Sequence, residues 1–203
     1  MFSKPYTYLA LGDSYTIGEN VAIYESFPYQ TIQLLRKSGH NFNSPEILAR
    51  TGWTTDDLKK GIRNTIFQNS YDFVSLLIGV NDQYHKKDMH EYATNFELLL
   101  KQAISFAANK TNHVFVLSVP DWSNTPFAEN NNNPTITEEI NAFNAANRKL
   151  AAEYKVHYIS ITQNPEGFPL DKSWLARDLL HPSGKEYANW ALRLAEEIQK
   201  LLT

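Results

Sequence analysis

The alternation of short apolar runs with longer stretches of helical period constrains the fold of this chain most. Five runs of four to six residues are predicted to be strands, at residues 6–11, 46–49, 73–78, 114–119 and 156–161. Stretches with helical periodicity separate them and follow the last one. Strands that alternate with helices in this way form a parallel sheet with helices on both faces. We therefore expect an α/β fold, a three-layer α/β/α sandwich around a five-stranded parallel sheet.

Two of the helical stretches have a well-defined apolar face. In residues 90–107 the apolar side chains recur at steps of three and four: Tyr92, Phe96, Leu99, Leu100, Ala103, Ile104 and Ala107. The last stretch repeats this pattern, and Ser183 and Glu186 have capping-box spacing at its start. Weaker helices are expected at residues 26–37 and 54–67.

Length and composition exclude several classes of protein. A chain of 203 residues with 42% hydrophobic residues suits a single domain over residues 1–203. The net charge of −3, with scattered Lys and Arg, gives no basic surface for nucleic acid. No apolar run is long enough to span a membrane or to form a signal-peptide core, so we expect a cytoplasmic protein. The absence of cysteine excludes disulfides, thiolate zinc sites and cysteine nucleophiles. The oligomeric state stays open.

Polar clusters follow the predicted strands. In "YLALGDSYTIGEN", residues 8–20, Ser14 stands where the first strand should end, with Gly18 and two acceptor side chains close behind. "RTGW" (residues 50–53), "GVND" (residues 79–82) and Asp121 with Trp122 occupy equivalent places. Ligands of open parallel sheets bind outside the carboxyl ends of the strands. We expect these clusters to meet at one rim, together with "DLLHPSGKEY", residues 178–187.

The residue types in these clusters suit nucleophilic catalysis. A serine hydroxyl needs an imidazole to accept its proton and a carboxylate to fix the tautomer of that imidazole. Asp178 and His181 offer both within four residues, and Pro182 restricts the backbone of His181. An oxyanion needs N–H donors, which Ser14, Gly52 and Asn81 are placed to supply.

The motifs "GDSYT", the isolated Gly52, "GVND" and "DLLH" resemble the four blocks of the SGNH hydrolases, also called GDSL esterases and lipases. The resemblance covers residues 12–181. It implies a flavodoxin-like sandwich, ester or thioester substrates and no cofactor. It further implies Ser14 as nucleophile, His181 as base and Asp178 as the group that orients the base. The oxyanion hole would consist of the N–H groups of Ser14 and Gly52 and the amide of Asn81.

The expected substrates are small-molecule esters with short to medium acyl groups, such as lysophospholipids, acetylated sugars or small esters. Trp53, Tyr84 and Trp122 stand near the predicted rim and are the candidate substrate-binding residues, since aromatic walls suit acyl chains and sugar rings alike. Tyr15 departs from the commonest family block, which has leucine there; this bears on substrate preference. Residues 123–134 form a long polar connection that is either a mobile lip over the site or a solvated loop.

Each residue also has a simpler interpretation. Ser14 could cap a helix, Asn81 could close a turn and Gly52 could provide a positive φ. The four blocks in one order favour a hydrolase over these separate roles. An alternative is a flavodoxin-like module in which Ser14 and Thr16 hold a flavin phosphate while Trp53, Tyr84 or Trp122 stacks on the ring.

A second alternative is a carbohydrate-binding relative without turnover. The flavin alternative leaves Asp178 and His181 without a role, and the intact four blocks disfavour the carbohydrate-binding relative. Asp13, Asp82 and Asp178 have no metal-ligand spacing with a histidine, so we expect no metal.

Overall fold

The computed structural model describes residues 4–129, 133–161 and 171–202. The described residues form a five-stranded sheet in the order β2-β1-β3-β4-β5, with every neighbouring pair parallel. The strands are β1 (Tyr8–Asp13), β2 (Glu46–Arg50), β3 (Phe73–Leu77), β4 (Val114–Leu117) and β5 (His157–Ile159). This is the flavodoxin-like order, in which the ligand crevice lies between β1 and β3, where the strand order reverses.

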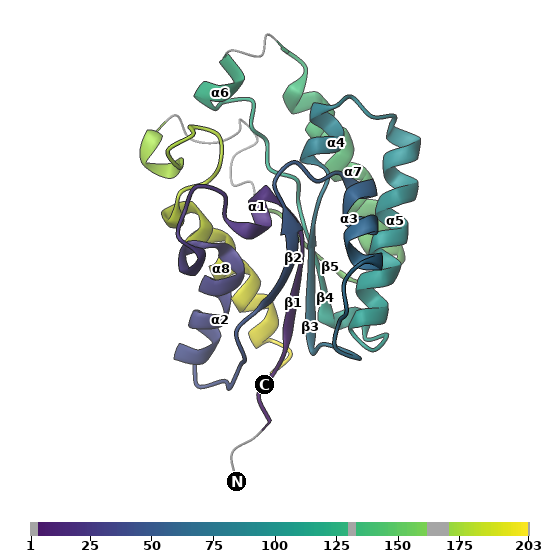
Figure 1. The fold of residues 1–203 in the computed structure, drawn as a ribbon, viewed down its shortest axis with the longest axis vertical. Helices are drawn as coiled ribbons and strands as arrows, with labels where there is room; N and C mark the ends of the chain where they lie inside the picture. Colours follow the sequence, from purple (N-terminus) through teal and green to yellow (C-terminus); the bar gives the residue numbers. More distant parts are fainter. Residues whose placement is uncertain (1–3, 130–132, 162–170, 203) are drawn as a thin grey trace.

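Helices cover both faces of the sheet (Figure 1). One face carries α2 (Phe27–Lys37) and α8 (Gly184–Gln199), and the other carries α3 (Thr55–Arg63), α5 (Met89–Phe106) and α7 (Ile136–Glu153). Each interface buries its own apolar cluster, with Phe27 and Trp190 on the first face and Phe96 and Leu99 on the second. The expected three-layer sandwich with a five-stranded parallel sheet is confirmed.

Short helices cluster at the carboxyl ends of the strands. α1 (Ser14–Ile17), α4 (Val80–Tyr84) and α6 (Pro126–Glu129) follow β1, β3 and β4, and all three lie at the upper end of the sheet in Figure 1. The 3₁₀ helices are η1 (Ile23–Glu25), η2 (Thr111–His113) and η3 (Lys172–Trp174). Among the described residues, no helix is both long enough and apolar enough to cross a bilayer.

Two local details differ from the sequence predictions. β1 runs on to Asp13, because Gly12 and Asp13 pair with Ala49 and Arg50 of β2. The prediction of a capping box at the start of α8 is wrong. The Ser183 hydroxyl donates to the carbonyl of Ser173 at 2.9 Å, and Glu186 accepts hydrogen bonds from Asn189 and Trp190. The Ser183 hydroxyl thus makes a tertiary contact and the Glu186 carboxylate makes contacts within α8, and neither caps the start of the helix.

Candidate active site

The junction between β1 and α1 places Ser14 at the carboxyl end of an interior strand of the sheet. Asp13 is the cap of α1, since its Oδ1 accepts the N–H of Tyr15 at 3.0 Å. The interpretation of Ser14 as the capping residue is therefore wrong. Gly12 allows α1 to follow so closely, because a Cβ there would lie 2.0 Å from Thr16 Oγ1 and 2.4 Å from the carbonyl oxygen of Leu77.

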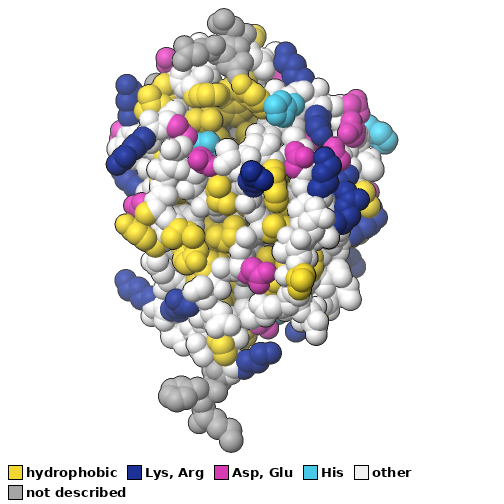
Figure 2. Space-filling model, in the orientation of Figure 1, with side chains coloured by type: hydrophobic (Ala, Val, Ile, Leu, Met, Phe, Trp, Pro, Cys, Tyr) yellow, Lys and Arg dark blue, Asp and Glu magenta, His cyan; other side chains and the backbone are white. Residues whose placement is uncertain are grey.

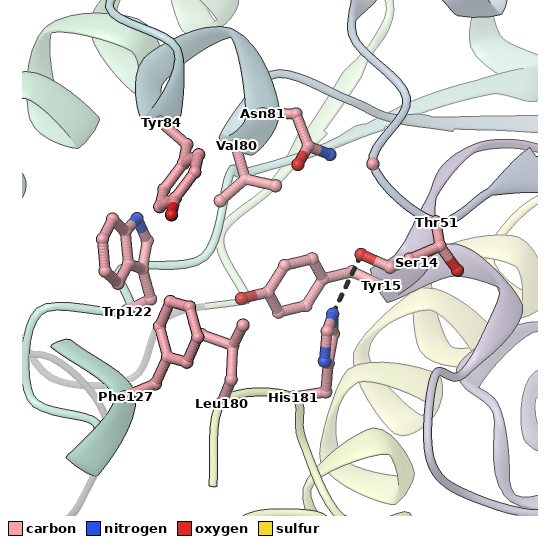
Figure 3. Close-up of a pocket in the computed structure, with 11 residues that line it drawn as sticks. Ser14, Tyr15, Thr51, Val80, Asn81, Tyr84, Trp122, Phe127, Leu180 and His181 are labelled. Carbon is pink, nitrogen blue, oxygen red and sulfur yellow. Dashed lines mark hydrogen bonds between the residues drawn. The ribbon is translucent and has the colours of Figure 1, made fainter. Parts of the chain in front are cut away.

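The loop before α8 brings a histidine and a carboxylate to this serine. His181 Nε2 lies 2.9 Å from Ser14 Oγ (Figure 3), and His181 Nδ1 lies 2.5 Å from Asp178 Oδ2. Oδ1 of Asp178 accepts the N–H groups of Leu180 and His181 at 3.1 and 3.0 Å. A positive φ of 58° at Leu179 turns the chain around the carboxylate. Ser14 and His181 are both buried, 4% and 6% exposed, so their contact is shielded from bulk water.

The Asp178 carboxylate is held in its ionised form. Partial burial raises its pKa, but the hydrogen bonds from the His181 ring and from the N–H groups of His181 and Leu180 outweigh burial, and the net pKa is lowered. An ionised carboxylate at Nδ1 keeps a proton on that nitrogen. Nε2 is then the nitrogen that can accept the serine proton.

Gly52 and Asn81 reach the same pocket from two other loops. Gly52, between β2 and α3, has a φ of +78°, and a Cβ there would meet nothing within 4 Å, so backbone conformation alone favours glycine. Asn81, in α4, donates one amide N–H to the carbonyl of Trp53 at 2.9 Å. Asp82 accepts the N–H and the hydroxyl of Thr55 at 2.9 and 2.6 Å, which ties α4 to the start of α3. These bonds fix the two loops against each other.

A pocket of about 230 Å³ opens beside Ser14. Its wall opposite Ser14 and His181 is aromatic (Figure 3). The ring centroids of Tyr84 and Trp122 lie 5.7 Å apart, and those of Trp122 and Phe127 lie 5.9 Å apart. Figure 2 shows hydrophobic side chains gathered over the same upper end of the molecule. The residues that line the pocket are Ser14, Tyr15, Thr51, Gly52, Val80, Asn81, Tyr84, Trp122, Phe127, Leu180 and His181.

The chain matches the model of the GDSL-like lipase/acylhydrolase family over residues 10–188. The chain belongs to this family. It is therefore a carboxylic ester hydrolase of the GDSL type, and the sequence resemblance is confirmed. No curated protein matches the chain in sequence.

Solved structures similar to this GDSL-like hydrolase share its fold at low sequence identity. A lipase/acylhydrolase from Enterococcus faecalis has a TM-score of 0.73 at 17% identity, covering 97% of this chain and 96% of its own. The psychrotrophic esterase EstA from Pseudoalteromonas sp. has a TM-score of 0.70 at 17% identity, with coverages of 97% and 98%. An acetylxylan esterase from Geobacillus stearothermophilus has a TM-score of 0.66 at 18% identity, with coverages of 95% and 94%.

The structure of this GDSL-like hydrolase places most of the sequence-predicted site residues at the pocket, and one of them elsewhere. It brings together Ser14, Gly52, Asn81, Asp178 and His181, and it places Tyr84 and Trp122 in the pocket wall. The ring of Trp53 lies elsewhere, packed against Gly61 of α3, where a Cβ would come within 2.4 Å of it. The expectation that the Trp53 ring lines the site is not supported, because its neighbour Gly52 faces the pocket while the ring turns under α3.

Sequence reasoning missed several pocket residues. Val80, Phe127 and Leu180 complete the apolar wall. Tyr15, which the sequence singled out for its bearing on substrate preference, extends from α1 across the pocket (Figure 3). An apolar residue beside each predicted catalytic side chain was the available signal for Val80 and Leu180. The proposed lip at residues 123–134 lies partly outside the described residues, since 130–132 are not described.

Asp13 of the GDSL-like hydrolase is an unusual carboxyl group. It is fully buried, and Oδ2 has no hydrogen-bond partner among the described residues. Burial raises its pKa to about 8; the Tyr15 N–H opposes this and the nearby Asp82 adds to it. Burial therefore favours the protonated form of this group, next to Ser14, at neutral pH. Within the described part of the chain no three carboxylate or imidazole groups gather as a metal site, so the absence of a metal stays a prediction.

Proposed function

We propose that this hydrolase cleaves esters through an acyl-enzyme on Ser14, with His181 as the base and Asp178 as the group that orients it. The observation that carries the proposal is the continuous contact from Ser14 Oγ to His181 Nε2 at 2.9 Å and from His181 Nδ1 to Asp178 at 2.5 Å. Nε2 takes the serine proton as Oγ attacks the ester carbonyl, and then gives it to the leaving alkoxide. A water molecule, deprotonated by the same nitrogen, releases the acid.

The oxyanion of each tetrahedral intermediate needs donors that are already in place. The proposed donors are the N–H groups of Ser14 and Gly52 and the second amide N–H of Asn81. Two features support the assignment of Asn81. Its amide faces the pocket beside Ser14 (Figure 3), and the bond to the Trp53 carbonyl uses only one of its two N–H groups. That bond also fixes the direction of the other N–H.

The volume and the lining of the pocket favour an ester substrate with a short to medium acyl group. Its volume of about 230 Å³ is below the roughly 300–1,000 Å³ of pockets for drug-sized ligands. Tyr84, Trp122 and Phe127 provide flat apolar contacts, and the Trp122 indole N–H donates to Gln83 at 2.9 Å, which holds the ring in place. Acetylated sugars and small esters fit this description better than long-chain lipids do.

The test is hydrolysis of a series of chromogenic esters from acetyl to decanoyl. We expect turnover that is greatest at the short end of the series and is abolished in Ser14→Ala. Ser105→Ala is a matched control, because Ser105 is an exposed serine of α5 outside the pocket, and this variant should retain wild-type rates. Turnover that survives in Ser14→Ala would remove Ser14 as the nucleophile, and an optimum at decanoyl would contradict the short-acyl assignment.

The alternative of a flavin-binding module gains no support from the site. It needs Thr16 at a phosphate, but Thr16 is fully buried, and the Ser14 hydroxyl is already in contact with His181. The carbohydrate-binding alternative differs from the proposal only in turnover, so the same ester series decides between them.

A further inference from the structure

The residues that follow α1 contact two of the loops that form the site. Asn20 Nδ2 donates to Asp178 Oδ2 at 2.6 Å, across a separation of 158 residues. Its neighbour Glu19 accepts a hydrogen bond from the hydroxyl of Thr51. The 18–20 segment thus joins the nucleophile helix to both the loop that carries Asp178 and the loop that carries Gly52.

Asn20 completes the hydrogen bonding of the Asp178 carboxylate. Backbone N–H groups occupy Oδ1, while Oδ2 accepts from the His181 ring and from Asn20. Without the amide, the imidazole would be the only partner of Oδ2 among the residues that the structure describes. A carboxylate fixed at both oxygens keeps its plane, and with it the direction of the imidazole.

Glu19 is bonded to Thr51, the residue that precedes the proposed oxyanion donor Gly52. Gly52 lies in a short loop with a positive φ, and the space that a Cβ would occupy there is open, so packing on that side does not fix it. The bonds to Asn81 and Asp82 hold residues that follow Gly52 in the chain. The bond from Thr51 to Glu19 anchors that loop to the segment that follows Ser14. The distance between the nucleophile and the Gly52 N–H then depends on this anchor.

We propose that Glu19 and Asn20 are positioning residues for the hydrolysis, Asn20 for Asp178 and Glu19 for Gly52. This inference rests on the proposed function. Each residue acts on a different part of the reaction, because Asp178 governs the base and Gly52 governs the oxyanion. Their substitutions should therefore have different kinetic signatures.

The backbone at Asn20 decides which variants are informative. Its φ is +62°, a conformation that asparagine, aspartate and glycine tolerate better than other residues. Asn20→Gly removes the amide and keeps the turn, and Asn20→Asp replaces the donor with a carboxylate. Asn109 has the same φ of 62° in the turn after α5, outside the pocket, so Asn109→Gly is a matched control for the backbone effect.

The first measurement is the pH dependence of kcat/KM. Asn20→Asp should move the acidic limb to higher pH by about one unit, because a second carboxylate beside Asp178 stabilises the protonated imidazole. Asn20→Gly should lower kcat about tenfold with little change in KM, as expected for loss of a hydrogen bond to a charged group. Asn109→Gly should behave as the wild type.

Other ionisable groups near the Asp178–His181 pair do not confuse this measurement. Burial raises the pKa of the phenols of Tyr15 in α1 and Tyr187 in α8, so both stay neutral. The neighbouring carboxyl groups are the same in the wild type and in both Asn20 variants: Asp13 of β1, Glu19 of the 18–20 segment and Asp121 after β4.

Glu19 is tested by the same profile with the opposite expectation. Glu19→Ala should lower kcat about fivefold. Any movement of its acidic limb should be to lower pH, because this variant removes a carboxylate near the imidazole, while the oxyanion donor itself carries no ionisation in this range. Thr51→Val removes the other side of the bond, and the double variant should be no slower than the slower single variant.

The outcomes separate the inference from the proposed function. An Asn20→Gly variant with wild-type kcat, or an unmoved limb in Asn20→Asp, overturns the role of Asn20 while Ser14-dependent turnover stands. Additive losses in Glu19→Ala and Thr51→Val overturn the role of Glu19. If the wild type shows no Ser14-dependent turnover, the proposed function fails instead. NMR titration of the His181 ring then still tests Asn20, since Asn20→Asp should shift that titration to higher pH.

Discussion

The Asn81 amide has two N–H groups, and one of them is committed to the carbonyl of Trp53. The other is the donor proposed for the oxyanion, and it costs no reorganisation when the charge develops. Removing one such donor typically lowers kcat by about 10²–10³. We expect Asn81→Ala to show this loss with little change in KM, measured with a short-chain chromogenic ester.

A second variant reverses the polarity of the group at position 81. Asn81→Asp keeps the size of the side chain but replaces both N–H groups with a carboxylate, which repels an oxyanion. Asn81→Asp should be at least as slow as Asn81→Ala. Both variants should show a measurable midpoint of urea unfolding, as expected if they are folded. An Asn81→Asp variant that is as fast as the wild type would exclude Asn81 from the oxyanion hole.

Between β1 and α1, packing and catalysis depend on the same glycine. A Cβ on Gly12 would overlap Thr16 Oγ1 and the Leu77 carbonyl oxygen, and backbone atoms of β3 cannot move aside cheaply. Gly12→Ala should destabilise the fold by about 1–3 kcal/mol, measured by urea unfolding, and should lower kcat by displacing Ser14. Adding Thr16→Ala removes one of the two clashes and should restore part of the stability. An unchanged unfolding midpoint in Gly12→Ala would contradict this account of the junction.

The elements themselves could be predicted from local sequence, but their contacts could not. Apolar runs and helical periods located all five strands and the helices α2, α3, α5 and α8, because these signals repeat within a few residues. The direction of the Trp53 ring was not predictable, since its position next to Gly52 does not say which way it turns. The bond between Asn20 and Asp178 was not predictable either, because it joins residues 158 positions apart that only the folded sheet brings together.

At the scale of the whole molecule, strand order explains why the predicted blocks meet. β1 lies between β2 and β3, so the loops that carry Ser14, Gly52 and Asn81 leave adjacent strands at the same edge. The loop with Asp178 and His181 does not follow a strand next to β1. It belongs to the connection between β5 and α8. Alternation of strands and helices predicts such a shared edge, but it does not predict how that last loop reaches Ser14.

The same arrangement makes global stability depend on pH through Asp13. Its carboxyl group is buried in the centre of this edge, and burial raises its pKa from 3.8 to about 8. Between these values the folded protein keeps a proton that the unfolded chain has released. The free energy of unfolding should therefore decrease as pH rises from about 4 to about 8, by at most about 1.4 kcal/mol per pH unit from this group.

Asp13→Asn isolates that contribution from all other titrating groups. Asparagine keeps an oxygen that can accept the Tyr15 N–H and cannot ionise, so the variant should lose the part of the pH dependence that Asp13 causes. The measurement is urea unfolding of both proteins at pH 5, 6.5 and 8. The wild type should lose stability relative to Asp13→Asn as pH rises. A constant difference between the two proteins would mean that Asp13 is ionised in the folded state throughout this range, with a charged Oδ2 that has no hydrogen-bond partner in the described part of the chain.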